Sequence, residues 1–495
     1  MALTIEEMNI FCRKKGFVFN SADIYGGLSG FFDYAPLGVE LKNNLKQAWY
    51  KFIVQNRRNV VAQDGSIITN PKVWKASGHL DGFADLVLTT KKSKTKLRAD
   101  HFIEDNLNIN AEGLSAKEIN ELIVKHNLNY KGEEFEEVKD FNLMFSTQVG
   151  AAVDGSNTAY LRPETCQSIF PNFKLIMEIS RQKLPFGIAQ IGKAFRNEIS
   201  PRDFLFRQRE FEQMELEFFI NPKDKKCPEL TEKHLSVKFN FLSAKNQDAE
   251  NMVNENSDIK SLLEQGSLSE WHAYWLSEMY FWYTEVLKFN PENLRIREHI
   301  KTELSHYSSA TFDLDYKFPN GFKEILGIAD RGQFDLKQHM IHSKSKLDVI
   351  DEETKERFIP SVIEPSQGLD RLFLAVLFEA FKDDKDRGNI VLKLASKLAP
   401  TFCAVFPLVR NKPEIVDKAK EIHNKLKTLF PCFYDQSGSV GRRYARQDEI
   451  GTPFCVTVDF ESLEDDCVTV RNRDTTEQER IKIDELPTYL LGMWI

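Results

Sequence analysis

Two stretches in which apolar and polar residues alternate stand near the middle of the chain, at residues 188–198 and 207–219. The loop between them contains Ser200, Pro201 and Asp203. Alternation with a period of two is typical of a β-strand, and loop residues of this kind favour a turn. We therefore expect two antiparallel strands joined by a long turn.

The second of these strands has two chemically different faces, because successive side chains point to opposite sides of a strand. One face is apolar, with Met214, Leu216 and Phe218. The other combines basic, aromatic, amide and acidic side chains, namely Arg207, Arg209, Phe211, Gln213, Glu215 and Glu217. An ordinary solvated face would carry more Lys, Thr and Ser, so this face is a candidate binding surface.

The spacing along this face suits a nucleotide that carries a small group. Phe211 and Glu215 stand roughly 13 Å apart at about 3.3 Å per residue, close to the reach from a base to a group on its 5′ phosphate. Arginine binds phosphate through paired, charge-assisted hydrogen bonds, and Phe211 can stack on a base. A salt-bridged surface hairpin is the alternative interpretation.

A second anion-binding signal lies at residues 362–378. We expect a strand that ends at Pro365, a tight turn at Gly368 and an apolar helix from about Asp370. Arg371 falls in the first turn of this helix, where the helix dipole disfavours a basic residue. An anion bound there would be attracted by both the dipole and the guanidinium group, which makes the arrangement favourable.

Two further helices are predicted in the first four hundred residues. An aromatic stripe at 271–283 favours a core helix over a surface that stacks on RNA. A helix after Pro36 carries a stripe of core type, formed by Leu41, Leu45, Ala48, Trp49 and Phe52.

The composition changes near Lys397. We expect a strand at 398–408, a helix at 413–429 and further strands at 440–445 and 455–460. Alternation of strands and helices indicates a small α/β domain.

Length, charge and cysteine content limit the possibilities. A chain of 495 residues is too long for one core, and its formal charge of −8 argues against a uniformly basic nucleic-acid-binding surface. The seven cysteines include no CxxC pair, which fits reduced thiols. The sequence opens without a signal-peptide pattern and has no apolar run of membrane-spanning length. We therefore expect a soluble, cytoplasmic protein.

The hairpin sequence, FRNE followed by a loop and RQREF, resembles motif 2 of class II aminoacyl-tRNA synthetases. Residues 25–38 resemble the glycyl-tRNA synthetase form of motif 1, with Ala35 where that pattern has Gly. Residues 160–167 are similar to the RPETAQ element of that family, with Cys166 in place of Ala. The other matching segments are 324–331 with ELxGIADR, 362–371 with the EPSxGxDR form of motif 3, and 439–453 with the anticodon-binding domain shared by glycyl-, prolyl-, threonyl- and histidyl-tRNA synthetases.

This resemblance implies an α+β catalytic domain at 1–397, a mainly antiparallel sheet flanked by helices with insertions at about 86–140 and 222–290. A smaller α/β anticodon-binding domain would follow at 398–495, and the protein would work as a homodimer through motif 1. The implied reaction is the ATP-dependent attachment of glycine to tRNA(Gly) through glycyl-adenylate.

The resemblance also implies roles for individual residues. Arg196, Glu198 and Arg371 would be the catalytic residues. ATP would be bound by Arg196 at the α-phosphate, Glu198 at the adenine amino group, Phe211 beneath the ring, and Arg207 and Arg371 at the outer phosphates, with Mg²⁺ bridging phosphate oxygens and Glu364 as its ligand. The implied glycine-binding set is Arg162, Glu164, Glu215, Arg331, Glu364 and Ser366. The implied tRNA-binding set is Arg442, Arg443, Tyr444 and Arg446.

The insertion at 86–140 departs from the pattern. Many relatives carry CxxC pairs before RADH and before FNLMF, whereas here residues 98–101 and 141–145 are present without those cysteines. No zinc is expected, because thiolates would have to hold it. The basic run at 91–98 is either a solvated loop or a contact for RNA phosphates.

Two other functions stay open at this point. A class II synthetase for proline, threonine or serine would lack the joint RPET and EPS acids. A non-catalytic RNA-binding paralogue would have lost the motif arginines, all of which are present.

Overall fold

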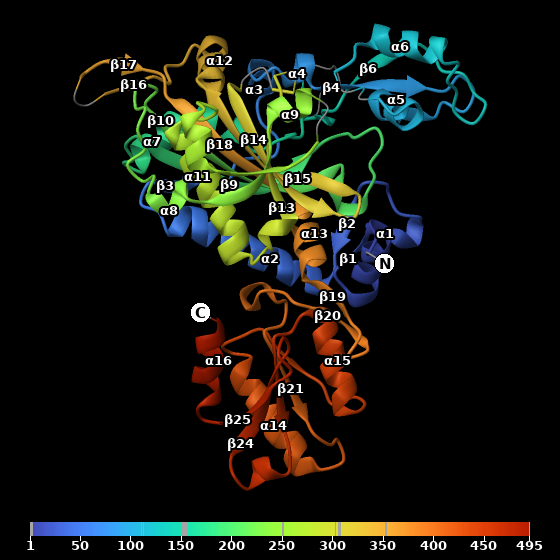
Figure 1. Cartoon of the computed structure of the whole chain (residues 1–495), viewed down its shortest axis with the longest axis vertical. Helices are drawn as coiled ribbons and strands as arrows, with labels where there is room; N and C mark the ends of the chain where they lie inside the picture. The colour runs from blue at the N-terminus through green and yellow to red at the C-terminus, as the bar shows by residue number, and fades with distance from the viewer. Residues whose placement is uncertain are drawn as a thin grey trace.

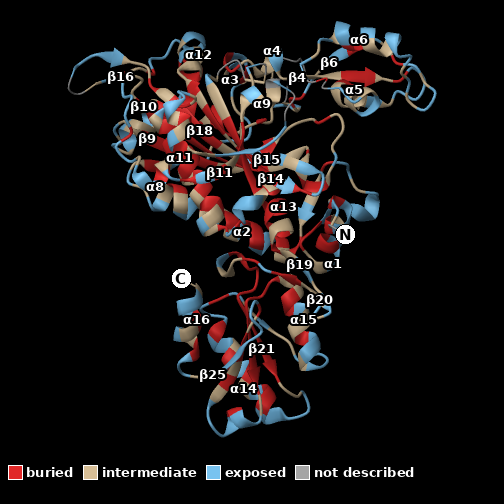
Figure 2. Ribbon diagram, viewed as in Figure 1, coloured by how far each residue is buried: buried red, intermediate tan, exposed pale blue. Residues whose placement is uncertain are grey.

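The computed structural model describes residues 3–109, 111, 113–150, 157–249, 252–301, 303–304, 308–351 and 354–494. The chain forms a large domain, and the C-terminal residues form a smaller domain beside it (Figure 1). Each has its own buried apolar cluster, as Figure 2 shows. Within the described residues, no helix is both long and apolar enough to cross a bilayer.

A nine-stranded sheet is the framework of the large domain. Its neighbours pair antiparallel except for β11 with β13 and β3 with β9. In spatial order the strands are β12 (Glu255–Asp258), β11 (Lys238–Leu242), β13 (Leu294–Glu298), β14 (Ala310–Phe318), β15 (Gly321–Gly332), β18 (Ser361–Gly368), β10 (Glu210–Ile220), β9 (Phe186–Phe195) and β3 (Val60–Ala62). This architecture is the mainly antiparallel α+β fold that the sequence predicts.

The predicted hairpin is β9 and β10, which pair from Phe195 opposite Glu210 to Phe186 opposite Phe219. The apolar face of β10 is fully buried, since Met214, Leu216 and Phe218 belong to the main core. Helices α11 (Glu270–Phe281) and α13 (Leu369–Ala380) contribute to the same core. The aromatic stripe at 271–283 is therefore a core helix, as expected. The opposite face of β10 is left to form a site.

The expected turn at Gly368 is wrong. Strand β18 continues through Pro365 to Gly368, and α13 begins at the next residue. Gly368 has a φ of −79°, so its backbone needs no glycine-specific conformation. The ladder to β10 pairs residues 213–215 with 366–368 and residues 218–220 with 361–363. The gap lies at Pro365, which has no N–H to donate.

The N-terminal part lies against α13. Helix α1 (Ile5–Lys15) precedes α2 (Pro36–Tyr50), which continues as a π-helical turn, Lys51–Gln55. Leu41, Leu45 and Trp49 are buried along the predicted stripe.

The insertion at 86–140 is a small α/β unit with its own apolar core. It contains β4 (Ala84–Thr89), β5 (Lys96–Arg98), β6 (Lys139–Asn142), α5 (Ala99–Leu107) and α6 (Ala116–Lys125). In its basic run, Lys91 pairs with Glu134 and Lys94 with Glu136, so part of the positive charge is compensated. The segment 222–290 is built into the large domain, because β11, β12 and α11 belong to its sheet and core.

The C-terminal domain has a five-stranded sheet, in the order β22 (Cys432–Tyr434), β21 (Cys403–Pro407), β23 (Phe454–Val458), β24 (Cys467–Asn472) and β25 (Gln478–Lys482). Its helices are α14 (Pro413–Leu426), α15 (Val440–Ile450) and α16 (Leu486–Trp494). The strand expected at 440–445 is wrong, because these residues begin α15. The buried residues of this helix are Arg443, Gln447 and Asp448, so its helical period is carried by polar side chains.

The two domains meet through a hairpin of the large domain, β19 (Phe381–Asp384) and β20 (Asn389–Leu392). Arg473 donates to the carbonyl of Leu394 at 2.7 Å, and Arg387 donates to the carbonyl of Arg473 at 2.7 Å. Lys15 of α1 also pairs with Glu449 of α15.

Candidate functional site

The polar face of β10 borders a cavity of about 210 Å³ that also touches the end of β18 and the start of α13. Every residue expected to bind ATP except Glu364 lines this cavity, namely Arg196, Glu198, Arg207, Phe211 and Arg371. The structure thus brings together parts of two motifs that are about 170 residues apart in the chain.

Arg196 is held between two aromatic rings. Its guanidinium carbon lies 5.3 Å from the ring centre of Phe211 and 5.5 Å from that of Phe83. Its Nε donates to the carbonyl of Pro163 at 3.1 Å. These contacts fix the direction of the guanidinium group beside the ring that is expected to stack on the base. Phe83, which precedes β4, was missed by the sequence analysis.

Arg207 stands beside Glu198 and His101. Its Nε lies 3.7 Å from a carboxylate oxygen of Glu198, and its Nη1 lies 3.3 Å from Nε2 of His101. Burial lowers the pKa of His101 to about 4, so the ring is neutral near pH 7 and adds no charge beside the arginine. His101 belongs to the RADH segment, for which the sequence analysis had no role.

Arg371 extends from the first turn of α13 into the cavity. It donates to the carbonyl of Phe206 at 3.2 Å and to the carboxylate of Glu324 at 3.1 Å. Its guanidinium carbon lies 4.4 Å from the ring centre of Phe206. Glu324 lines the same cavity and exposes 46% of its side chain, so the cavity has an accessible carboxylate.

Burial increases along the polar face of β10, from the half-buried Phe211 to Glu215, which is 2% exposed. Glu215 accepts hydrogen bonds from the N–H and hydroxyl of Thr165, from Ser366 Oγ at 2.7 Å and from Gln213 Nε2 at 2.8 Å. Burial and the neighbouring Glu164 raise the pKa of Glu215, although these hydrogen bonds oppose the shift. Two members of the implied glycine-binding set, Glu215 and Ser366, are thus hydrogen-bonded neighbours.

Glu164 is the second carboxylate of this pocket. It accepts from Cys166 Sγ at 3.0 Å and lies 3.5 Å from Nε2 of His79. Burial alone would raise the pKa of Glu164, but His79 and Arg331 hold it well below its usual range. His79 stands in α4 (His79–Gly82), outside every motif quoted from the sequence.

Arg331 is buried and engages two carboxylates. Its Nε and Nη2 donate to Asp335 at 2.7 and 2.8 Å, and its Nη1 donates to Glu364 at 2.9 Å. Burial raises the pKa of Glu364 to about 7 against the opposing charge of Arg331. Glu364 thus lies in a buried ionic cluster with Arg331, and it is not among the described residues that line the 210 Å³ cavity.

Arg162, expected to bind glycine, is bound to the backbone instead. Its Nε donates to the carbonyl of Lys193 and its Nη1 to that of Gly65, both at 2.6 Å. A Cβ on Gly192 would lie 2.1 Å from Arg162 Nη2, so a larger residue there would displace the guanidinium group. We infer that Arg162 positions the segment that carries Glu164.

The four residues expected to bind tRNA differ in exposure. Arg442 and Arg446 are exposed on α15, and Arg446 pairs with Asp435. Arg443 is 1% exposed and donates to the carbonyls of Pro407, Leu408, Asp435 and Gly438. Tyr444 is half-buried, with its hydroxyl 2.6 Å from that of Thr457. Arg443 thus stabilises the domain from inside.

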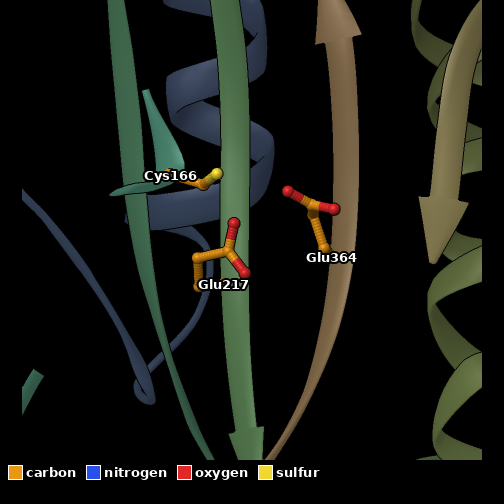
Figure 3. A group of neighbouring side chains, drawn as sticks. All are labelled: Cys166, Glu217 and Glu364. Atoms are coloured by element: carbon orange, nitrogen blue, oxygen red, sulfur yellow. The ribbon is translucent and has the colours of Figure 1, made fainter. Parts of the chain in front are cut away.

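Glu217 is a further residue of the polar face, and it is fully buried. Its carboxyl group lies beside Cys166 and Glu364 (Figure 3). The alternation of β10 placed it on this face, but no motif gave it a role. His79, Phe83 and His101 had no comparable signal, because only the folding of the chain brings them to the site.

Two family models match the chain. The tRNA synthetase class II core domain (G, H, P, S and T) matches residues 149–381, and the anticodon binding domain matches residues 403–493. The chain is 43% identical to the glycine–tRNA ligase of Acetivibrio thermocellus, over 99% of this chain and 98% of the relative. It is 44% identical to that of Geobacillus thermodenitrificans, over 99% and 97%, and 43% identical to that of Mesoplasma florum, over 98% and 99%. A chain that aligns with these enzymes over nearly its whole length, and that joins a class II core to an anticodon-binding domain, belongs to the glycine–tRNA ligase family of class II aminoacyl-tRNA synthetases.

Proposed function

We propose that this protein uses ATP to attach glycine to tRNA(Gly), through glycyl-adenylate. One arrangement carries the proposal: a cavity lined by three arginines and Phe211 lies next to a buried cluster of carboxylates along the same face of β10. The cavity suits a nucleoside triphosphate, and the carboxylate cluster suits a small ammonium group.

The cavity residues take the following roles. Phe211 stacks on the adenine ring, and Glu198 accepts from the adenine amino group. Arg196 binds the α-phosphate and stabilises the charge that develops there in the in-line displacement, while Arg207 and Arg371 bind the outer phosphates. No protein nucleophile is needed, because catalysis rests on positioning and charge stabilisation.

In the buried pocket, Glu164, Glu215 and Glu364 with Ser366 surround the glycine ammonium group, and Arg331 binds the carboxylate. Arg331 already contacts Asp335 and Glu364, so its guanidinium direction is fixed before glycine arrives. The close packing leaves no room for a methyl group. Steric conflict can reject alanine by more than the roughly 1–3 kcal/mol that a missing methylene provides.

A divalent ion with ATP, Mg²⁺ by this proposal, would supply charge neutralisation between phosphate oxygens when bound. Glu324 suits it better than Glu364, because Glu324 lines the nucleotide cavity with an accessible carboxylate. Glu364 instead lies in the buried pocket with Arg331.

The C-terminal domain would bind the anticodon, with Arg442 and Arg446 as its exposed basic groups. A homodimer is supported by apolar side chains that stand exposed at the start of the segment resembling motif 1 and directly before it. Ile24, Tyr25 and Leu28 are 89%, 86% and 60% exposed, and such a patch marks an interface. We place the reaction in the cytoplasm.

Amino-acid-dependent exchange of pyrophosphate into ATP tests the proposal. We expect exchange with glycine and none with alanine, proline, serine or threonine. Exchange driven by another of these amino acids would overturn the choice of glycine. Absence of exchange with every amino acid, from protein that is folded and binds tRNA, would favour an RNA-binding paralogue.

A further inference from the structure

A buried cluster of ligand-type side chains lies beside the proposed glycine pocket (Figure 3). Cys166 comes from a short 3₁₀ turn, Cys166–Ser168, while Glu217 lies on β10 and Glu364 on β18. One sulfur and two carboxylate oxygens all stand within 4.8 Å of one another, and all three residues are buried. In the part of the chain that the structure describes, this is the single group of its kind.

Glu217 is the unusual member of this cluster. It is 0% exposed, and neither of its carboxylate oxygens has a hydrogen-bond partner among the described residues. An unpartnered buried carboxylate is costly, because it loses its hydration without replacement. Figure 3 shows its side chain pointing into the space between Cys166 and Glu364.

The strand register explains why this carboxylate has a like-charged neighbour. Pairing on both sides of the break at Pro365 places Glu217 directly opposite Glu364. Like charges at directly opposed positions destabilise a sheet. Arg331 reaches Glu364 but is also engaged by Asp335. The cluster therefore has an excess of negative groups that a cation would balance.

We propose that Cys166, Glu217 and Glu364 bind one divalent transition-metal ion of the zinc class, and that the bound ion excludes glycine. Zinc accepts thiolate and carboxylate ligands together, whereas Mg²⁺ and Ca²⁺ prefer oxygen alone. With Zn–S near 2.3 Å and Zn–O near 2.1 Å, ligand atoms stand about 3.5 Å apart, which lies within the 4.8 Å limit on the present separations.

Proton balance in this binding step is simple. The Cys166 thiol proton leaves to solvent, together with any proton held by Glu217 or Glu364, as the ion takes their places.

Competition with glycine follows from a shared ligand, and this part of the inference rests on the proposed function. Glu364 is one of the carboxylates proposed to receive the ammonium group. A metal ion that takes Glu364 removes that acceptor and places a second positive charge beside the ammonium site. Zinc would thus act as a glycine-competitive inhibitor at a site distinct from the insertion, where no zinc is expected.

Cobalt(II) provides a direct test, because a thiolate ligand gives it a charge-transfer band in the near ultraviolet. The full-length protein, stripped of metal, is titrated with Co²⁺ alone. We expect the band in the unaltered protein and in Cys227→Ala, a matched control at another buried cysteine. Cys166→Ala and Cys166→Ser should lose the band, and Glu217→Gln should weaken Co²⁺ binding by at least about tenfold.

Two results would overturn the inference. A missing band in the unaltered protein, or a band that both Cys166 variants retain, would show that Cys166 does not bind the metal ion. If glycine does not weaken Co²⁺ binding, and Zn²⁺ does not raise the KM for glycine in pyrophosphate exchange, competition is eliminated. A protein without any exchange activity would instead count against the proposed function, since the cobalt band does not depend on catalysis.

Discussion

The ammonium group of Lys42 lies 3.0 Å from a carboxylate oxygen of Asp370, and both side chains are buried although 328 residues separate them in the chain. Lys42 also lies 3.1 Å from Glu212, and Asp370 accepts from the N–H of Glu212 at 2.7 Å. Lys42 stands in α2, which follows the segment resembling motif 1, while Glu212 lies on β10 and Asp370 in α13. One buried ionic cluster therefore joins α2 to both elements that border the cavity proposed to bind ATP.

Lys42→Met should lower the free energy of unfolding by about 3–5 kcal/mol, because it leaves buried carboxylates without their cation. Lys46→Met is the matched control, since Lys46 pairs with the same Glu212 but its side chain is 29% exposed. Its loss should cost at most about 1 kcal/mol. Urea unfolding of both variants measures their free energies of unfolding. An equal decrease in the two variants would contradict a special role for Lys42.

The same contact should depend on pH. Burial by itself raises the pKa of Asp370, but Lys42, Tyr34 and the Glu212 N–H together lower it below the ordinary value. A group with a depressed folded-state pKa stabilises the protein above the unfolded pKa, about 3.9, and this contribution disappears as the pH falls through the folded value. The difference in free energy of unfolding between the unaltered protein and Asp370→Asn should stay constant from about pH 5 to about pH 7. It should shrink below about pH 4. A gap that is unchanged in acid would contradict this assignment.

Glu215→Gln should weaken the binding of glycine far more than the binding of ATP. The amide would present an NH₂ group to the donors of Thr165, Ser366 or Gln213 and would lose the charge that attracts the ammonium group. We expect the KM for glycine to rise roughly 10- to 150-fold in pyrophosphate exchange, with little change in the KM for ATP. Phe211→Leu is the counterpart and should mainly raise the KM for ATP. An equal rise in the KM for glycine and the KM for ATP in Glu215→Gln would contradict the proposal that different parts of β10 bind the two substrates.

Arg443→Gln and Arg442→Gln should separate stability from tRNA binding. Arg443 satisfies buried carbonyl oxygens, so its loss should destabilise the C-terminal domain by at least about 2 kcal/mol. Arg442 is exposed, so its loss should leave stability unchanged, weaken tRNA binding and reduce the salt dependence of binding by about one phosphate contact. Thermal unfolding and tRNA binding at several salt concentrations measure both effects. An Arg442 variant with unaltered tRNA affinity would exclude it from the interface.

A chain that ends at Lys397 should keep glycine-dependent pyrophosphate exchange and lose most tRNA charging. All proposed ATP and glycine contacts precede this residue, but the cut removes Arg473, which binds the carbonyl of Leu394, and so lowers stability at the hairpin of β19 and β20. Circular dichroism and sizing come first, to establish a folded dimer. Charging by that dimer at nearly the full-length rate, with subsaturating tRNA, would show that the C-terminal domain does not read the anticodon.

Much of the site could be predicted from local patterns. Alternation alone predicted the pairing of β9 with β10, the apolar face of Met214 and the polar face of Glu215. The unusual position of Arg371 in the first turn of α13 indicated an anion site, and the structure places Arg371 in the cavity that we propose to bind ATP. These signals depend on neighbours within a few residues, which is why they can be read along the chain.

Other features left no local signal. Helix α15 buries Arg443, Gln447 and Asp448, so a hydrophobic period could not reveal it. Gly368 was predicted to lie in a turn, yet pairing with β10 continues the strand to the start of the helix. Here tertiary contacts outweighed residue preferences.

The sequence by itself determined the mainly antiparallel architecture, the order of the two domains and the residue types that a nucleotide and an ammonium group require. Only the tertiary structure decided which charged groups are neighbours. It bound Arg162 and Arg443 to backbone carbonyls, brought His79 to Glu164, and placed Glu217 opposite Glu364 beside Cys166. The physical reason is that the energy of a charge depends on its burial and on partners that are hundreds of residues away, and neither is fixed until the sheet is assembled.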